Sequence, residues 1–117
     1  MLNQDVNVTF REENNRLTAS LSGDVDHHSA FSVRKRIDDE LLSKKPAALS
    51  LDLSDVTFMD SSGLGLILGR LNKANEIGTV LLIENPSPQI DKILELAGIG
   101  RLVQIERSIK KQEGMKK

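Results

Sequence analysis

The chain has 117 residues, of which 38% are hydrophobic, 28% charged and 3% aromatic, and it contains no cysteine. This length suits one globular domain that buries about 65% of its unfolded surface without disulfides or metal, so we expect these residues to form a single domain. The formal net charge of -1 supplies no field that would hold nucleic acid or anionic lipid non-specifically. We therefore expect no nucleic-acid partner, and the few aromatic residues predict an aliphatic core.

The hydropathy pattern predicts neither a membrane span nor a secretory leader. The longest uncharged run, residues 61–69, has nine residues, whereas a membrane-spanning helix needs about 20 apolar residues. Residues 1–10 include Asp5 and lack the basic and apolar regions of a signal peptide. The expected compartment is the cytoplasm.

The first half of the chain predicts a hairpin, a helix and a buried strand. Residues 7–11 and 17–21 alternate in hydropathy around a turn at Asn14-Asn15. Apolar residues recur at helical spacing over residues 26–43, and Pro46 ends that helix. The apolar run at residues 47–53 predicts a strand in the centre of the sheet.

The second half of the chain continues the alternation of helices and strands. The predicted elements are a loop over residues 54–60, a helix through residues 64–74 that ends at Gly78, a strand at 79–83, a turn at 85–88, a helix through 90–97 and a short strand at 102–105. Right-handed crossovers then imply an α/β fold, with a mixed, mostly parallel sheet that begins with a hairpin. We assign residues 1–107 to this domain and 108–117 to a frayed hydrophilic tail.

The segment Asp24-Val25-Asp26-His27-His28 is a candidate metal site because it holds both histidines of the chain. Adjacent histidines point in different directions on a helix or a strand, and the chain has no further histidine or cysteine to complete a site. We therefore interpret the segment as a polar helix start, with Asp26 as the N-cap and both histidines in solvent. No metal is expected.

The serines and glycines after residue 58 lack the motifs of known catalytic loops. A nucleophile elbow needs a glycine two residues before its serine, and Met59 and Asp60 occupy those positions. The spacing of Gly63, Gly65 and Gly69 fits neither a P-loop nor a dinucleotide fingerprint. We interpret these glycines as packing residues that let their helix approach the sheet or a partner.

The run Asp60-Ser61-Ser62-Gly63 lies at a predicted junction between a strand and a helix. One serine is expected to serve as the N-cap of the helix, which leaves the second hydroxyl exposed beside Gly63. A phosphate there would meet the positive end of the helix dipole, so the fold would tolerate it. It would also add about -1.5 to -2 charges to the surrounding surface.

Two segments resemble a known family, the anti-sigma factor antagonists with a STAS domain. They are Gly23-Asp24-Val25-Asp26-His27-His28 and the run from Phe58 to Arg70 with Asp60-Ser61-Ser62-Gly63-Leu64-Gly65 at its start. The chain is most similar to the sporulation stage II antagonists of the sigma-F pathway. The resemblance extends from about the first strand to Ile105, and the order of strands and helices agrees with a STAS domain.

The resemblance implies a protein without catalysis or cofactor of its own that binds an anti-sigma factor serine kinase and so frees a sigma factor. The kinase, which holds the ATP, phosphorylates Ser61, with Ser62 as an alternative. Asp26, Asp60, Ser61, Ser62 and Gly63 are then the partner-binding residues. A phosphatase of the PP2C type would restore Ser61.

Three further readings stay open at this point. The general stress response uses antagonists with a very similar motif, and scaffold subunits of large particles share the fold. A small hydrolase would instead use Ser61 with His27 or His28. For the antagonist we expect a monomer or a small oligomer.

Overall fold

Strands and helices alternate along residues 6–107, the part of the chain that the computed structural model describes. The predicted tail, residues 108–117, lies outside it. The elements are β1 (Val6–Glu13), β2 (Arg16–Val25), α1 (His27–Lys44), β3 (Ala48–Met59), α2 (Ser61–Ile77), β4 (Val80–Glu84), α3 (Pro88–Leu96), a 3-10 turn η1 (Ile99–Arg101) and β5 (Gln104–Glu106).

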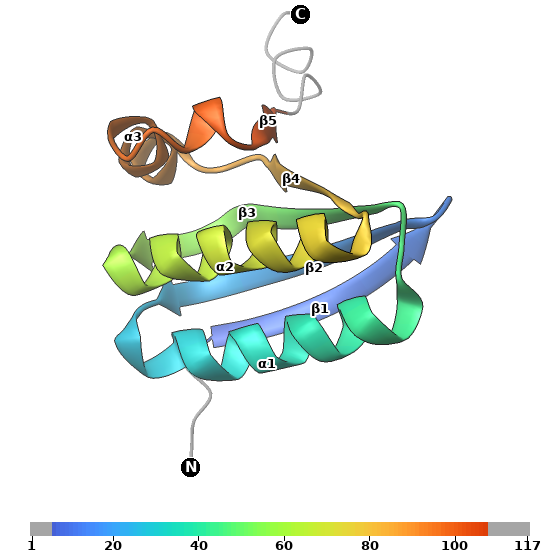
Figure 1. Cartoon of the computed structure of the whole chain (residues 1–117). Coiled ribbons are helices and arrows are strands. Elements are labelled where there is room, and N and C mark those ends of the chain that lie inside the picture. The colour runs from blue at the N-terminus through green and yellow to red at the C-terminus, as the bar shows by residue number, and fades with distance from the viewer. Residues whose placement is uncertain (1–5, 108–117) are drawn as a thin grey trace, which may run out of the picture.

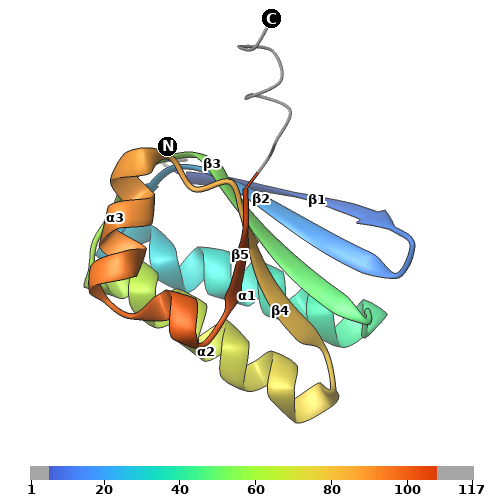
Figure 2. The same cartoon turned by 90° about the horizontal axis from the view of Figure 1, so that it is seen from above.

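The strands form a mixed sheet in the order β1-β2-β3-β4-β5, in which β1 is antiparallel to β2 and the other pairs are parallel. Strand β3 is therefore central, and the predicted α/β fold is confirmed. Each parallel connection steps in the same direction across the sheet, and right-handed crossovers then place their helices on the same face. Helices α1 and α2 lie side by side on that face (Figures 1 and 2).

The hairpin β1-β2 turns at two asparagines in the left-handed conformation, Asn14 with φ 54° and Asn15 with φ 64°. Two consecutive positive φ values give a turn whose twist matches that of the strands, and asparagine is one of the few residues that adopts them readily. The turn lies at the far end of the sheet from the starts of α1 and α2 (Figure 1).

Strand β3 is longer than predicted, because residues 54–59 continue the strand instead of forming a loop. They pair with the end of β2, where Val56 aligns with Gly23, Phe58 with Asp24 and Met59 with Val25. Polar residues in this stretch are exposed, which gave the local sequence its loop-like pattern. The connection from β3 to α2 is therefore the single residue Asp60.

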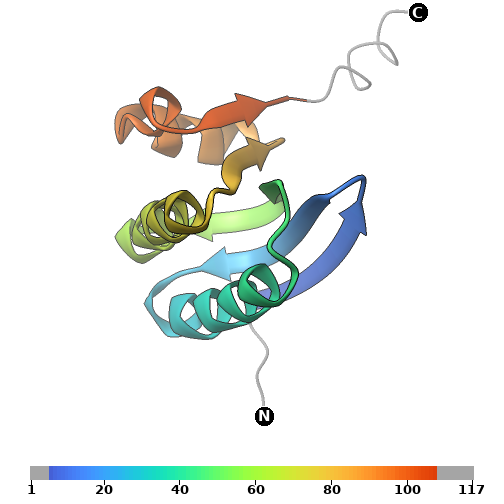
Figure 3. The same cartoon turned by 45° about the vertical axis from the view of Figure 1, so that its right-hand side comes forward.

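The core lies between the sheet and the helices and is aliphatic, as predicted. Its largest fully buried side chains come from β2, β3 and β4 on one side and from the three α-helices and η1 on the other: Leu17, Val25, Leu49, Leu51, Leu53, Ile83, Ile37, Leu41, Ile67, Ile90, Leu94 and Ile99. Figure 3 shows α3 and β5 at the opposite edge of the molecule from α1. Burial of these residues holds α1 and α2 in place on the sheet.

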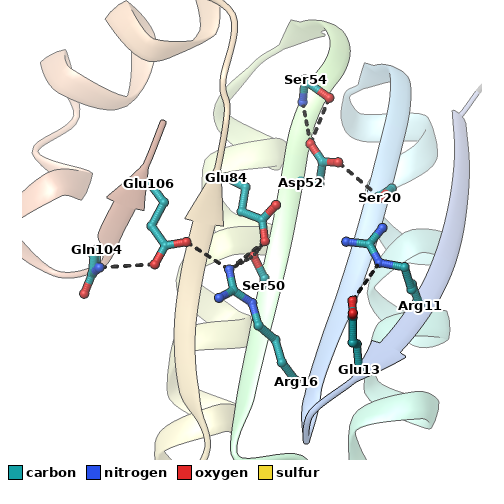
Figure 4. Close-up of polar contacts among 10 residues, drawn as sticks. All are labelled: Arg11, Glu13, Arg16, Ser20, Ser50, Asp52, Ser54, Glu84, Gln104 and Glu106. Atoms are coloured by element: carbon teal, nitrogen blue, oxygen red, sulfur yellow. Dashed lines mark hydrogen bonds and ion pairs between the residues drawn. The ribbon is translucent and has the colours of Figure 1, made fainter. Parts of the chain in front are cut away.

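The opposite face of the sheet carries a polar network that crosses four strands (Figure 4). Arg16 Nη2 donates to Glu84 Oε2 at 2.6 Å, to Glu106 Oε1 at 3.0 Å and to Ser50 Oγ at 3.2 Å. The hydrogen bond to Glu106 is the largest cause that raises the pKa of the Arg16 guanidinium. The network ties β2, β3, β4 and β5 together where no helix of the described residues covers them.

The first turn of α2 packs against the ends of β2 and β3, and Gly63 is the residue that permits it. A methyl group at Gly63 would overlap Met59 Cγ and lie 3.0 Å from the carbonyl oxygen of Val25. The prediction of a close approach is thus confirmed for Gly63. It is wrong for Gly65 and Gly69 with respect to the sheet, because a methyl group at either would meet nothing within 4 Å.

Alanine substitutions at Gly63 and Gly65 are expected to change stability in opposite directions. Gly63→Ala should lower the free energy of unfolding by about 1–3 kcal/mol, since Met59 and the β2 backbone must move. Gly65→Ala adds a helix-favouring residue in open space and should raise the free energy of unfolding by up to about 1 kcal/mol. Urea denaturation of both variants measures the two changes, and shifts of the same sign would contradict this packing.

Candidate functional site

The starts of α1 and α2 lie next to each other at one end of the sheet. Their preceding strands pair to their last residues, Val25 with Met59, and the backbone N–H of Asp60 donates to the Val25 carbonyl at 3.4 Å. Parallel strands present their carboxyl ends at the same edge. The fold therefore brings Asp26 and the run from Asp60 to Gly63 together at this edge, and we call it the helix-start site.

Asp26 caps α1, as the sequence predicts. Its Oδ1 accepts from the backbone N–H of His28 at 2.9 Å and of Ser29 at 3.2 Å, and the Ser29 hydroxyl accepts from the Asp26 N–H at 3.0 Å. This reciprocal capping box fixes the carboxylate. The hydrogen bond from the Ser29 backbone is the main cause that lowers the pKa of Asp26.

The cap of α2 is Asp60, so the prediction of a serine cap is wrong. The Asp60 carboxylate accepts from the backbone N–H of Ser62 at 2.8 Å, and Asp60 is extended with φ -112° and ψ -164°. An aspartate in extended backbone can satisfy the free N–H groups as well as a serine does, and it comes one residue earlier. Ser61 and Ser62 thus become the first two residues of the helix.

Neither serine hydroxyl is used by the fold. Ser61 is exposed and Ser62 half-buried, and neither hydroxyl hydrogen-bonds to any residue within 6–107. Ser61 therefore presents a free hydroxyl at the positive end of a helix of 17 residues. A modifying enzyme can reach it without unfolding any part of the structure.

Three carboxylates at the carboxyl ends of β2 and β3 set the charge of the helix-start site. Asp26 and Asp60 cap the two helices, and Asp24, which is exposed, accepts a hydrogen bond from the Thr57 hydroxyl at 2.9 Å. A phosphate on Ser61 would gain from the helix dipole. It would also make this end of the molecule strongly negative.

The two histidines are exposed, and their ring centroids lie 5.7 Å apart in an edge-on arrangement. No hydrogen bond within residues 6–107 joins either ring to Ser61 or Ser62. In the same residues no group of three or more histidine, cysteine, aspartate or glutamate side chains is placed to hold a metal ion. The arrangement offers binding contacts and a modifiable hydroxyl.

Sequence reasoning missed a groove of about 430 Å³ that runs from the helix-start site between α1 and α2. The residues that line it recur at helical spacing in the sequence. His27, Phe31 and Arg34 recur on one face of α1, and Ser62, Gly65 and Gly69 on one face of α2. The two stripes were not connected, because only the tertiary structure places the two helices side by side.

Comparison with known proteins assigns the family. The family model of the STAS domain matches residues 6–112. The chain belongs to the STAS-domain family. It is 32% identical over 102 residues to an anti-sigma F factor antagonist of Paenibacillus polymyxa, a match that covers 86% of this chain and 87% of that protein. The resemblance to the anti-sigma factor antagonists is thereby confirmed.

A second curated relative and one solved protein extend this comparison. The anti-sigma-B factor antagonist of Bacillus subtilis strain 168 is 28% identical over 101 residues, 86% of this chain and 91% of that protein. The Bacillus protein SpoIIAA shares the fold at 23% identity. The TM-score is 0.75 for its unphosphorylated form, with 92% of both chains covered, and 0.69 for its phosphorylated form, with 92% of this chain and 96% of that chain covered.

Membership decides the class of protein. The STAS-domain anti-sigma factor antagonists are regulatory binding proteins, so this chain is a regulatory binding protein and not an enzyme, which excludes the Ser/His hydrolase. Among the described helices none combines the length and the hydrophobicity that crossing a membrane requires.

The capping role of Asp26 predicts a pH dependence of stability. Because the folded protein lowers the pKa of this carboxyl below its ordinary value of 3.8, the charged cap stabilises the fold above that value. The stabilisation decreases as the pH falls through the lower pKa of the folded state. Urea denaturation of wild type and Asp26→Asn should therefore show a wild-type advantage at pH 5 that shrinks at pH 3. An advantage that grows on acidification would contradict this role.

Proposed function

We propose that the unphosphorylated chain binds an anti-sigma factor serine kinase and releases the sigma factor that the kinase held, and that phosphorylation of Ser61 ends this binding. The observation that carries the proposal is the Ser61 hydroxyl, exposed and without a partner among the described residues at the start of α2. The kinase holds the ATP, so the chain itself needs no cofactor.

The neighbouring residues support Ser61 in different ways. Asp60 holds the first turn of α2 through its cap, and Gly63 lets that turn sit against the strand ends. The Oδ1 atom of Asp26 accepts the capping bonds, while its Oδ2 atom accepts none within residues 6–107 and is free for a donor on the partner. Ser62, half-buried, is the alternative acceptor of the phosphate.

A phosphate on Ser61 acts as a switch through charge alone. Within the free chain it is stabilised by the helix start, so the fold need not change. In a complex the same group would be buried as an unpaired dianion beside Asp26 and Asp60, which costs several kcal/mol. Since 1.4 kcal/mol is about tenfold in affinity, we expect binding to weaken roughly a thousandfold or more.

The switch needs an enzyme for the return step, and we assign it to a metal-dependent phosphatase of the PP2C type. The cycle would take place in the cytoplasm with the chain as a monomer or a small oligomer. The sigma-F relative from Paenibacillus polymyxa favours a role in sporulation-specific transcription. The sigma-B relative from Bacillus subtilis keeps the general stress response as the second candidate, either as an antagonist or as a scaffold subunit.

Variants of the two serines test the switch with the anti-sigma factor kinases of the same genome. Ser61→Asp should lose kinase binding by isothermal titration calorimetry, because it places a negative charge in the interface. Ser61→Ala should bind like the wild type and resist phosphorylation, and Ser62→Ala should stay a substrate. Equal affinity of Ser61→Asp and Ser61→Ala would contradict the proposal.

Intact mass before and after incubation with each kinase and ATP shows whether one phosphate is added, and peptide mapping across residues 53–70 places it. We expect it on Ser61 of the wild type and also of a variant with both His27 and His28 replaced by alanine. The chain is assigned to the sigma-F or the sigma-B pathway according to which kinase binds it more tightly. Size-exclusion chromatography distinguishes the small antagonist from a subunit of a large particle.

A further inference from the structure

The groove between α1 and α2 has a buried cation, Arg70, in its wall. The side chain of Arg70 is 5% exposed, and its Nε lies 2.9 Å from Asp38 Oδ1 in an ion pair. Nevertheless, Nε, Nη1 and that carboxylate oxygen are buried without a hydrogen-bond partner among the described residues. Unsatisfied buried donors are rare in proteins, so Asp38 pairs with Arg70 through charge but leaves the guanidinium incompletely hydrogen-bonded.

The charges around the groove favour an anion. Arg34 and Arg70 both line it, and no acidic side chain does. Burial is the main cause that lowers the pKa of the Arg70 guanidinium; Asp38 opposes this effect and Arg34 adds to it, so the two guanidinium groups repel each other. A negative group between them would remove the repulsion and accept charge-assisted hydrogen bonds from the guanidinium groups that line the groove.

Apolar residues, Ala30, Phe31 and Leu66, form part of the groove wall beside the polar His27 and Ser62. The Phe31 ring is 65% exposed and lies 5.1 Å from the Arg34 guanidinium carbon, and Leu66 forms part of the wall. Gly65 and Gly69 leave the surface of α2 without side chains, and an added methyl group there would meet nothing within 4 Å. Such a surface accommodates apolar side chains on both sides of one charge.

We propose that the α1–α2 groove receives an acidic side chain, aspartate or glutamate, from an apolar segment of the protein partner. This inference rests on the proposed function for the existence of that partner and adds the chemistry that the partner presents. The groove opens beside Ser62, so one surface can cover Ser61 and the groove together. The partner then carries an anion opposite Arg34 and Arg70 and a hydrogen-bond donor opposite Asp26.

The first test is calorimetric binding of the full chain to the kinase, with matched controls. Arg34→Glu should weaken binding tenfold or more, whereas the same reversal at Lys35, exposed on α1 outside the groove, should stay within twofold of the wild type. Gly65→Leu should also weaken binding at least tenfold, because its side chain fills the groove. Urea denaturation checks that each variant is folded.

The second test does not need the kinase. A hexapeptide of alternating leucine and glutamate is titrated into labelled chain, and the side-chain Nε–H signal of Arg70 and the amide signals of Gly65 and Gly69 are followed by NMR. We expect these signals to shift with this peptide, but neither with its glutamine counterpart nor with the glutamate peptide added to Arg34→Glu. Equal shifts with inorganic phosphate would make the groove a small-anion site and overturn the proposal.

The two tests separate this inference from the proposed function. If the kinase binds the wild type, Arg34→Glu and Gly65→Leu with equal affinity, the groove proposal is wrong and the Ser61 switch stands. If no kinase binds the wild type, the proposed function fails, and the peptide titration alone decides the groove: shifts support it, and unchanged signals overturn it.

Discussion

The pairing of β2 with β3 through their last residues, Val25 and Met59, determines the rest of the site. Register shifts between Ser20 and Ser22 and between Gly23 and Asp24 allow this pairing to continue to the strand ends. Because the strands end together, the helices that follow them start together. Asp26 therefore shares one surface with Asp60 and the serines at the start of α2, although they are far apart in the chain.

Helices cover one face of the sheet, and the groups that stabilise the fold lie away from the helix-start site. Aliphatic side chains of the strands and helices fill the covered side, and the Arg16 network with its acidic partners closes the other. Neither uses the serines at the start of α2. The helix-start site can therefore change its charge without disturbing the groups that hold the fold together.

The identity of the α2 cap has a direct consequence for function. Because Asp60 accepts the hydrogen bond from the N–H of Ser62, the helix needs no serine hydroxyl as its cap. The Ser61 hydroxyl is therefore not needed for capping. The same end of the molecule is acidic, while the groove that leads away from it is lined by Arg34 and Arg70. Under the two proposals, a partner that matches both regions would carry both signs of charge, and one added phosphate would oppose its contact with the acidic end.

Local patterns in the sequence determined the elements: the asparagine turn of the hairpin, the helical spacing in α1 and the serines at the start of α2. These features depend on neighbours within a few residues, so they can be read without the fold. The family motif likewise pointed to Ser61 and Asp26. Only the tertiary structure decided the length of β3, which sets where α2 begins, and the burial of Arg70 against Asp38. Each of these depends on strand pairing or helix packing between distant segments, whose geometry no local pattern encodes.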